Sequence, residues 1–222
     1  DSVAGDGAID APIDAPIAAP IDAHALSVGA DFASAATAGW VGPQLARERL
    51  QAVRVHVWDD CGALGDALSA AGLRCEPLSG PEQIAALEPA RSMVVIAATE
   101  QQPLARLRAA NTACLQHGVS WLPVGGFDGA SVHVGPLMIP GQTACAECLL
   151  RRLAANVEYA GVFHEVAGAP SAPTPRALRE WANSVATLIL LRWLAGRDAA
   201  LPGLLLTLAP GELAMRQARV YR

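Results

Sequence analysis

The sequence predicts an α/β protein with a Rossmann-like sheet and flanking helices, and three observations carry this prediction. Short apolar stretches alternate with amphipathic ones over residues 53–124, as in a parallel sheet covered by helices. Residues 93–98, MVVIAA, are continuously apolar, which is typical of a strand buried on both faces. Residues 204–208 and 213–221 flank Pro210-Gly211 and predict a closing antiparallel hairpin.

Each further element follows from a local pattern. Residues 53–57 alternate apolar and polar side chains, so we expect a strand there. Residues 103–117 carry leucines on one side of a helix that Gly118 ends. Residues 176–194 follow a proline and form the longest expected helix. The remaining expected elements are helices at 43–50, 63–71, 81–87 and 148–156, strands at 74–78, 119–124 and 130–137, and a loop at 161–175.

The chain divides into a low-complexity arm or linker rich in Ala, Pro and Asp, residues 1–42, and a folded domain, residues 43–222. Within the arm, Pro12, Pro16 and Pro20 recur every four residues. Repeated proline excludes helix and disfavours an internal strand, so we expect an extended segment, with order beginning near Pro43. The arm is interpreted either as a linker or as a segment that docks on a partner through its isoleucines.

The composition excludes several classes of function. The net charge of the 222-residue chain is −5 and it has no basic run, so we expect neither nucleic acid nor a membrane as partner. All 16 basic residues are arginine, which excludes a P-loop lysine or a lysine clamp on a nucleotide phosphate. Five cysteines, an odd number, do not resemble a secreted disulfide framework, so we expect a reducing, cytoplasmic setting.

The most specific motif is Cys145-x-x-Cys148, which follows a short apolar strand and a Pro-Gly turn and opens a helix. Two thiols at this spacing reach one metal ion, so both are candidate zinc ligands. A structural zinc site needs two such pairs, and no cysteine follows Cys148, so the motif is a half-site. Other residues that could complete it, although the predicted elements do not gather them, are Cys61, Cys75, Cys114 and His164.

Three other interpretations of this pair stay open. The thiols can be ordinary side chains without metal. Cys145 can be a nucleophile whose pKa is lowered by the helix start, but no histidine is adjacent to activate it. A thioredoxin-like redox role is disfavoured, because that motif follows the first strand of its own fold.

The turn after the first strand, Asp59-Asp60-Cys61-Gly62-Ala63-Leu64-Gly65, lies where a dinucleotide or ATP fold has G-x-G-x-x-G. Gly62 and Gly65 match the last two glycines, and Asp60 replaces the first. A carboxylate there adds negative charge facing a phosphate, so we expect a degenerate nucleotide loop that does not bind ATP. The paired aspartates suggest magnesium, but helix capping is the better interpretation without a phosphate loop.

His56 and His133 lie on predicted strands and are expected to be structural, and His164 has no identifiable partner. The helix at 176–194 is apolar around much of its circumference, so it is either central in the core or half of a homodimer interface. One face of this helix can carry Trp181, Val185, Leu188, Leu191 and Leu194 together, whereas Ile189 and Trp193 point elsewhere.

The segment G-P-L-x-x-P-G-x-T-x-C-x-x-C-L at residues 135–149 resembles the crossover segment of ThiF-like proteins, relatives of the ubiquitin-activating enzymes. It is most similar to the bacteriocin cyclodehydratase, or leader-peptide-binding, branch. The resemblance covers about residues 50–222. It implies a ThiF-type sheet with a crossover segment and C-terminal antiparallel strands, and a helix that packs against a second subunit.

The resemblance also implies a function. Proteins of this branch assist YcaO-type enzymes, which use ATP to form thiazole and oxazole heterocycles on ribosomal precursor peptides. Because the phosphate loop is degenerate and lysine is absent, we expect a non-catalytic partner that brings the leader peptide to such an enzyme. The family's small leader-binding module has no counterpart in residues 1–42.

Two enzymatic alternatives stay open. One is a ThiF-type adenylyltransferase that uses ATP and magnesium on a peptide or sulfur-carrier C-terminus. The missing lysine and Asp60 count against it. The other is an NAD-dependent oxidoreductase, which rests on the general Rossmann pattern alone.

Overall fold

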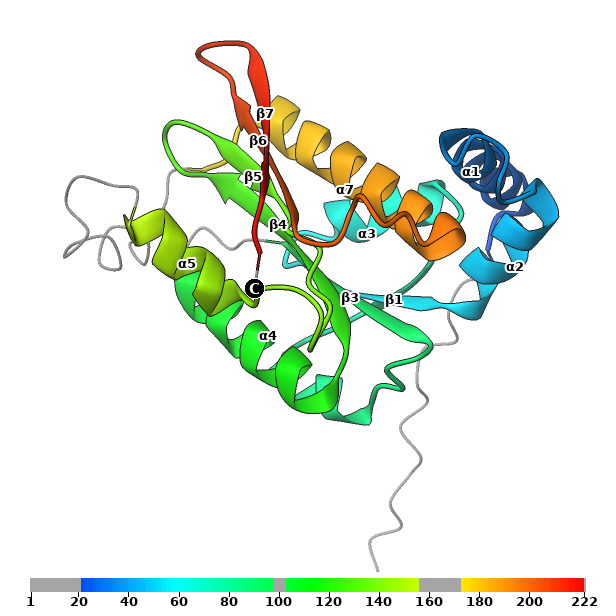
Figure 1. Cartoon of the computed structure of the whole chain (residues 1–222), viewed down its shortest axis with the longest axis horizontal. Helices are drawn as coiled ribbons and strands as arrows, with labels where there is room; N and C mark the ends of the chain where they lie inside the picture. Colours follow the sequence, from blue (N-terminus) through cyan, green and yellow to red (C-terminus); the bar gives the residue numbers. More distant parts are fainter. Residues whose placement is uncertain (1–20, 98–102, 156–172, 222) are drawn as a thin grey trace, which may run out of the picture.

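The computed structural model describes residues 21–97, 103–155 and 173–221. A seven-stranded sheet lies between two layers of helices (Figure 1). The strands are β1 (Arg54–Trp58), β2 (Arg74–Pro77), β3 (Ser92–Ala97), β4 (Ser120–Phe127), β5 (Val132–Val134), β6 (Leu204–Ala209) and β7 (Ala214–Arg219). The helices are α1 (Ala23–Ala36), α2 (Pro43–Ala52), α3 (Ala63–Ala70), the 3₁₀ helix η1 (Pro81–Ala86), α4 (Pro103–His117), α5 (Ala146–Ala155) and α7 (Arg176–Gly196).

The sheet has the order β2-β1-β3-β4-β5-β6-β7 and changes character at β4. Strands β2, β1, β3 and β4 run parallel, joined by helices, whereas β4 to β7 are antiparallel neighbours. Parallel strands need a crossover connection, but antiparallel ones can be joined by short turns. The arrangement confirms the predicted fold class, including the C-terminal antiparallel strands.

The apolar run in β3 is explained by the two cores on either side of the sheet. Met93 and Val95 pack into one core with residues of α1, α2, α3 and α7. Val94 and Ile96 pack into the other with residues of η1, α4 and α5. Since successive side chains of a strand point to opposite faces, a strand covered on both faces must be apolar at every position.

Helix α1 corrects the expectation that order begins near Pro43. Asp22 caps this helix by accepting a hydrogen bond from the backbone N–H of His24 at 2.8 Å. Its residues Leu26, Ala30 and Ala33 are buried in the core with α7. The prolines recur only as far as Pro20, so the alanine-rich stretch after them is free to form a helix. The expectation of an extended arm over residues 1–42 is therefore wrong for residues 23–36, and it stays a prediction for residues 1–20, which lie outside the described residues.

Helix α7 is central in the core over much of its surface. Ile189, Leu191 and Leu194 are buried, whereas Leu188 is 44% exposed. Of the face expected to meet a second subunit, Leu188 is thus exposed, whereas Leu191 and Leu194 are buried, because α7 packs on β4, β5, α1, α2 and α3. The homodimer itself stays a prediction.

The remaining elements lie within a few residues of their expected bounds. The strand expected at 130–137 is shorter, and isolated bridges join Trp121 to Met138 and Leu137 to Pro202. His164 and most of the loop expected at 161–175 lie outside the described residues. In the part of the chain that the structure describes, no helix is long and apolar enough to span a membrane.

Candidate functional site

The carboxyl ends of β1 and β3 form the topological switch point of the sheet. From β1 the chain passes through α3 to β2 on one side, and then returns through η1 to β3 on the other. Ligands of open α/β sheets bind in the crevice at such a point, where the first helix N-terminus faces phosphate. The turn between β1 and α3 is therefore the candidate position for a nucleotide site.

The carboxylate of Asp59 occupies the N-terminal end of α3. Its Oδ2 accepts a hydrogen bond from the backbone N–H of Leu64 at 2.8 Å. Its Oδ1 accepts bonds from the backbone N–H of Cys61 at 3.1 Å and from the Cys61 thiol at 3.2 Å. Amides at this end of a helix have no intrahelical partner and are the ones that bind phosphate. Asp59 thus places the protein's own anion there, as the capping interpretation predicted.

Asp60 is held by an arginine from the neighbouring element. Its Oδ1 lies 2.5 Å from Nη2 of Arg106 in α4, whose side chain is only 12% exposed. Arg106 Nη1 donates to the carbonyl of Ala97 at the end of β3, at 3.2 Å. The guanidinium lies 4.7 Å from the centre of the Trp58 ring, a cation–π distance. The Arg106 guanidinium thus contacts the carboxylate of Asp60, the carbonyl of Ala97 and the ring of Trp58 at the same time.

The two glycines of the turn lie where the sequence placed them. Gly62 has a φ of +74° and directly precedes α3, and Gly65 lies in its first turn, against Val57. The positive φ explains why glycine suits position 62. The cavity at this point, bounded by Asp59, Ala97 and residues of α7, measures about 60 Å³. Sites for cofactors usually measure roughly 300–1,000 Å³.

Cys145 and Cys148 lie at the beginning of α5, with their sulfurs 3.5 Å apart. Two thiolates at tetrahedral zinc, with Zn–S bonds of about 2.3 Å, lie about 3.8 Å apart, so the pair fits two of four ligand positions. The hydrogen bond from the Cys145 thiol lowers the pKa of Cys148, and the charges of Arg152 and Arg151 act in the same direction.

Among the described residues, the structure brings no other candidate ligand to this pair, and His164 lies outside them. No group of three His, Cys, Asp or Glu residues capable of holding a metal occurs among the described residues. Burial raises the pKa of Cys75, and raises that of Cys114 to about 12, so neither is a ready thiolate. Cys61 is tied to Asp59 at the switch point. The zinc half-site stays a prediction.

The start of α5 is fixed to α4 by two contacts that the sequence analysis missed. The side-chain oxygen of Asn111 accepts a hydrogen bond from the backbone N–H of Ala146 at 2.9 Å, and the contact is buried. Arg108 Nε lies 3.3 Å from a Glu147 carboxylate oxygen at the surface. An asparagine in a helix interior is the one sequence signal that could have indicated such a tertiary cap.

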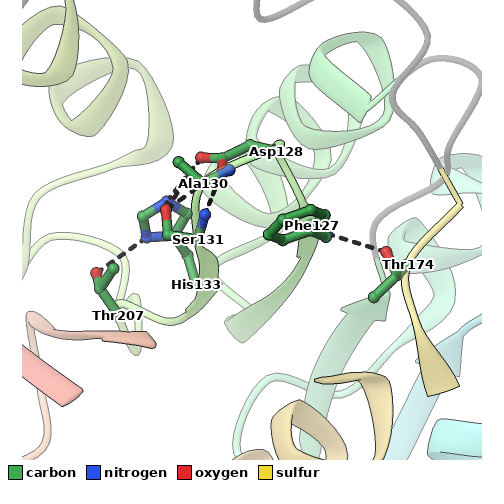
Figure 2. Close-up of polar contacts among 7 residues, drawn as sticks. All are labelled: Phe127, Asp128, Ala130, Ser131, His133, Thr174 and Thr207. Carbon is green, nitrogen blue, oxygen red and sulfur yellow. Dashed lines mark hydrogen bonds and ion pairs between the residues drawn. The ribbon is translucent and has the colours of Figure 1, made fainter. Parts of the chain in front are cut away.

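The hairpin between β4 and β5 carries the densest polar cluster (Figure 2). Asp128 accepts hydrogen bonds from the backbone N–H groups of Ala130 at 2.9 Å and Ser131 at 2.7 Å. His133 Nε2 lies 3.3 Å from Asp128 and 3.0 Å from Ser131 Oγ, and its Nδ1 lies 3.0 Å from Thr207 Oγ1 of β6. The cluster therefore ties β4, β5 and β6 together.

This Ser, His and Asp grouping does not have the geometry of a hydrolase triad. In a triad the aspartate contacts Nδ1 and the serine contacts Nε2 of the histidine. Here Ser131 Oγ and Asp128 Oδ2 both contact Nε2 of His133, and Thr207 Oγ1 contacts its Nδ1. His133 is thus structural, as expected from its place on a strand. The Asp-Gly dipeptide at 128–129 is a hairpin signal that could have located this turn.

Asp128 is kept ionised by its surroundings. Burial by itself would raise its pKa, but the hydrogen bonds from His133, Ala130 and Ser131 and the charge of His133 outweigh burial. They hold the pKa of Asp128 well below its usual value. Near it, the backbone N–H of Phe127 donates to Thr174 Oγ1 at 2.9 Å, which fixes the chain just before α7 (Figure 2).

His56 is buried on β1, and its Nδ1 lies 3.6 Å from a carboxylate oxygen of Glu76 on the neighbouring strand β2. Burial lowers its pKa, and Glu76 opposes that effect. It lies at the middle of the strand, away from the switch point at the strand's carboxyl end. Its contacts agree with the expected structural role.

No family model matches the chain, and no curated protein matches it. Solved structures do match. A heterocyclase in complex with substrate and cofactor is 22% identical at a TM-score of 0.64, over 81% of this chain and 26% of the heterocyclase. The heterocyclase TruD is 22% identical at a TM-score of 0.61, over 82% of this chain and 28% of TruD. E. coli MccB with MccA is 12% identical at a TM-score of 0.64, over 87% of this chain and 72% of MccB.

This chain thus spans about a quarter of the length of the heterocyclase chains that it matches. At these identities the likeness concerns the fold. The parallel core and the C-terminal antiparallel strands are the shared architecture. The chain therefore has the ThiF-like fold of the heterocyclase and MccB structures, as its sequence resemblance predicted.

Proposed function

We propose that this protein is a non-catalytic ThiF-like partner in the biosynthesis of thiazole- or oxazole-containing ribosomal peptides. In this role it presents the precursor peptide to a YcaO-type, ATP-dependent cyclodehydratase in the cytoplasm. The observation that carries the proposal is the Asp59 carboxylate bound to the backbone N–H groups of Cys61 and Leu64. A nucleotide phosphate would need those same groups.

Three further observations support the absence of adenylation chemistry. Asp60 adds a second carboxylate beside the turn, and its arginine partner is already engaged. The cavity at the switch point, about 60 Å³, is small for a nucleotide. The chain contains no lysine to bind a transferring phosphoryl group.

The peptide-related part of the proposal draws on the structural relatives. The matched heterocyclase is described with its substrate, and MccB with MccA. About three quarters of the heterocyclase chain lies outside the match, so we assign the cyclodehydration step to a YcaO-type enzyme. Recruitment raises the effective concentration of the peptide at that enzyme without chemistry in the recruiting chain.

Two structural expectations belong to the same proposal. Cys145 and Cys148 hold a zinc ion together with two ligands from outside the described residues, which fixes the start of α5. The protein forms a homodimer through the part of α7 around Trp181, whose side chain is half-buried.

Reconstitution tests the proposed function. The purified chain, a YcaO-type enzyme, its precursor peptide and ATP are combined, and the peptide mass is followed with each component omitted in turn. We expect a loss of water, 18 Da per heterocycle, that requires this chain, and no ATP consumption by the chain alone. ATP–pyrophosphate exchange by the chain alone, together with peptide modification independent of it, would instead establish an adenylyltransferase.

A further inference from the structure

Strand β7 leaves one edge of the sheet open. It is the last strand in the order of the sheet, and its only strand neighbour among the described residues is β6 (Figure 1). Five of its six residues are exposed. A strand at an edge presents a row of backbone groups to which another strand can bind.

The pairing register shows which backbone groups face outward. The backbone N–H of Val220 donates to the carbonyl of Gly203 at 2.8 Å, just beyond the paired residues. Hydrogen-bonded and non-hydrogen-bonded pairs alternate along an antiparallel ladder. The backbone groups of residues 214, 216 and 218 therefore face β6, and those of Met215, Gln217 and Arg219 point away from it.

The same three side chains border a groove beside α7. Met215, Gln217 and Arg219 pair with Leu208, Leu206 and Leu204, and Leu206 belongs to the core that α7 covers. Their side chains therefore lie on the α7 face. The groove between α7 and the β6–β7 hairpin measures about 520 Å³. Its apolar lining includes Leu188, which is 44% exposed, and Met215, which is 55% exposed.

The charge of this edge is positive. Of the strands that the structure describes, β7 alone carries two arginines and no acidic residue. Arg219 donates to the carbonyl of Ala200 at 2.8 Å, a neutral partner, and it forms no ion pair with an acidic side chain of the described residues. In the groove, Arg192 forms an ion pair with Asp198, but its Nε is buried without a hydrogen-bond partner.

We propose that the outer edge of β7 binds an extended segment of the precursor peptide by strand addition. The segment carries an apolar and an acidic side chain on the face turned toward α7. This inference rests on the proposed function and locates its peptide site. The apolar side chain packs against Met215 and Leu188, and the acidic one pairs with Arg219. Because Met215 and Arg219 are four residues apart, the two recognised side chains are also four apart.

A second copy of β7 is a poorer occupant of this edge. Pairing two β7 strands would bring four arginines and no carboxylate into the new ladder, and like charges on neighbouring strands are destabilising. An acidic segment has the opposite charge and satisfies the same backbone groups.

The probe is a fluorescein-labelled peptide, Glu-Thr-Val-Thr-Val-Thr-Val-Thr-Glu, which reads the same in both directions and so fits either strand polarity. Binding to the full chain is followed by fluorescence anisotropy. We expect binding to be lost when the backbone nitrogens along both edges of the peptide are methylated. The reason is that an added strand bonds to β7 through its backbone groups, by one edge in the antiparallel polarity and by the other in the parallel one.

Charge reversal gives a second and independent test. Arg219→Glu should weaken binding of the glutamate peptide by roughly tenfold and strengthen binding of the same peptide with lysine in place of glutamate. Arg216→Glu changes the net charge equally but lies on the opposite face of β7, where it pairs with Glu212. We expect it to change the affinity by less than about twofold.

Three outcomes would overturn the inference. Equal losses of affinity for the glutamate peptide in Arg219→Glu and Arg216→Glu would indicate non-specific charge attraction. Peptide binding that N-methylation does not change would exclude strand addition. Light scattering that shows a dimer dissociated by Arg219→Glu would assign the edge to a second copy. If Arg219→Glu leaves reconstituted cyclodehydration dependent on the chain but unchanged in rate, the inference fails and the proposed function stands. If the reaction does not need the chain, the proposed function fails whatever the probe does.

Discussion

The Asp59 carboxylate and the backbone N–H of Leu64 are joined by a hydrogen bond of 2.8 Å at the N-terminal end of α3. This contact gives the helix end an anion from within the chain. In strand–turn–helix units of nucleotide-binding proteins, the backbone amides at this end of the helix bind a phosphate. Two predictions concern the ends of helices, one concerns the β4–β5 hairpin, and one concerns the thiol pair.

Replacing Asp59 by alanine should lower the free energy of unfolding by about 1 kcal/mol, because the amides of Cys61 and Leu64 lose their acceptor. The freed amides should also gain a weak affinity for inorganic phosphate. Urea unfolding with and without phosphate measures both effects. Asp66→Ala, which removes a charge from the first turn of the same helix, is the matched control. It should lower the free energy of unfolding by less than Asp59→Ala does. Equal phosphate effects in both variants would contradict the prediction.

Replacing Asn111 by alanine should destabilise the protein by about 1–3 kcal/mol, because the buried N–H of Ala146 is left without an acceptor. Since that N–H lies at the start of α5, the thiols of Cys145 and Cys148 should also react faster with a maleimide. Chemical denaturation and timed labelling with mass spectrometry check both effects. Arg108→Ala removes only the exposed ion pair with Glu147 and should cost no more than about 0.5 kcal/mol. Similar losses of stability in the two variants would show that the contact between α4 and α5 as a whole, and not the Asn111–Ala146 hydrogen bond, stabilises the start of α5.

The Asp128 carboxylate should make stability depend on acid pH. Its pKa in the folded protein lies below its unfolded value, so its contribution is present above about pH 4 and is lost as the pH falls further. The difference in unfolding free energy between the wild type and Asp128→Asn should therefore be largest near neutral pH. It should shrink as the pH falls from about 5 to about 2. Urea titrations of both proteins at each pH measure it, and a constant difference would contradict the assignment.

In the metal-free protein, Cys148 should react faster with iodoacetamide than an ordinary thiol below about pH 8, because its lowered pKa increases the thiolate fraction. Replacing Cys145 by alanine removes the hydrogen bond that favours the thiolate and should slow the reaction several-fold. Peptide mapping by mass spectrometry measures the rate at Cys148 itself. Cys61→Ala, a change at another free thiol, is the control and should leave that rate unchanged. A rate that Cys145→Ala does not alter would show that the pair does not act as a unit.

Some of the fold and site could be predicted because the signals are local. The alternation of residues 53–57 and the apolar run at 93–98 were enough to place β1 and β3, since each strand's pattern reflects which faces are covered. The capping role of Asp59 was also predictable, because a carboxylate just before a helix has few other uses. The zinc half-site and the homodimer stay predictions from the resemblance.

Other features depend on residues far apart in the chain. Helix α1 escaped prediction because proline periodicity dominates the preceding residues, while the surfaces that bury Leu26 and Ala33 come from elsewhere in the core. The Asn111–Ala146 bond joins α4 to α5, and the Arg106–Asp60 pair joins α4 to the turn after β1. No spacing rule brings these residues together.

By itself, then, the sequence determined the order of the strands and helices after Pro43, the glycine turn at Gly62 and Gly65, and the ThiF-like likeness. These depend on the period of apolar side chains and on short motifs, which are properties of neighbours along the chain. Only the tertiary structure decided which partners Asp59 and Arg106 bind, which side chains contact His133, and that β7 leaves an open edge beside α7. Hydrogen-bond partners and exposed edges are set by where distant segments meet in space, and that is fixed by packing of the whole domain.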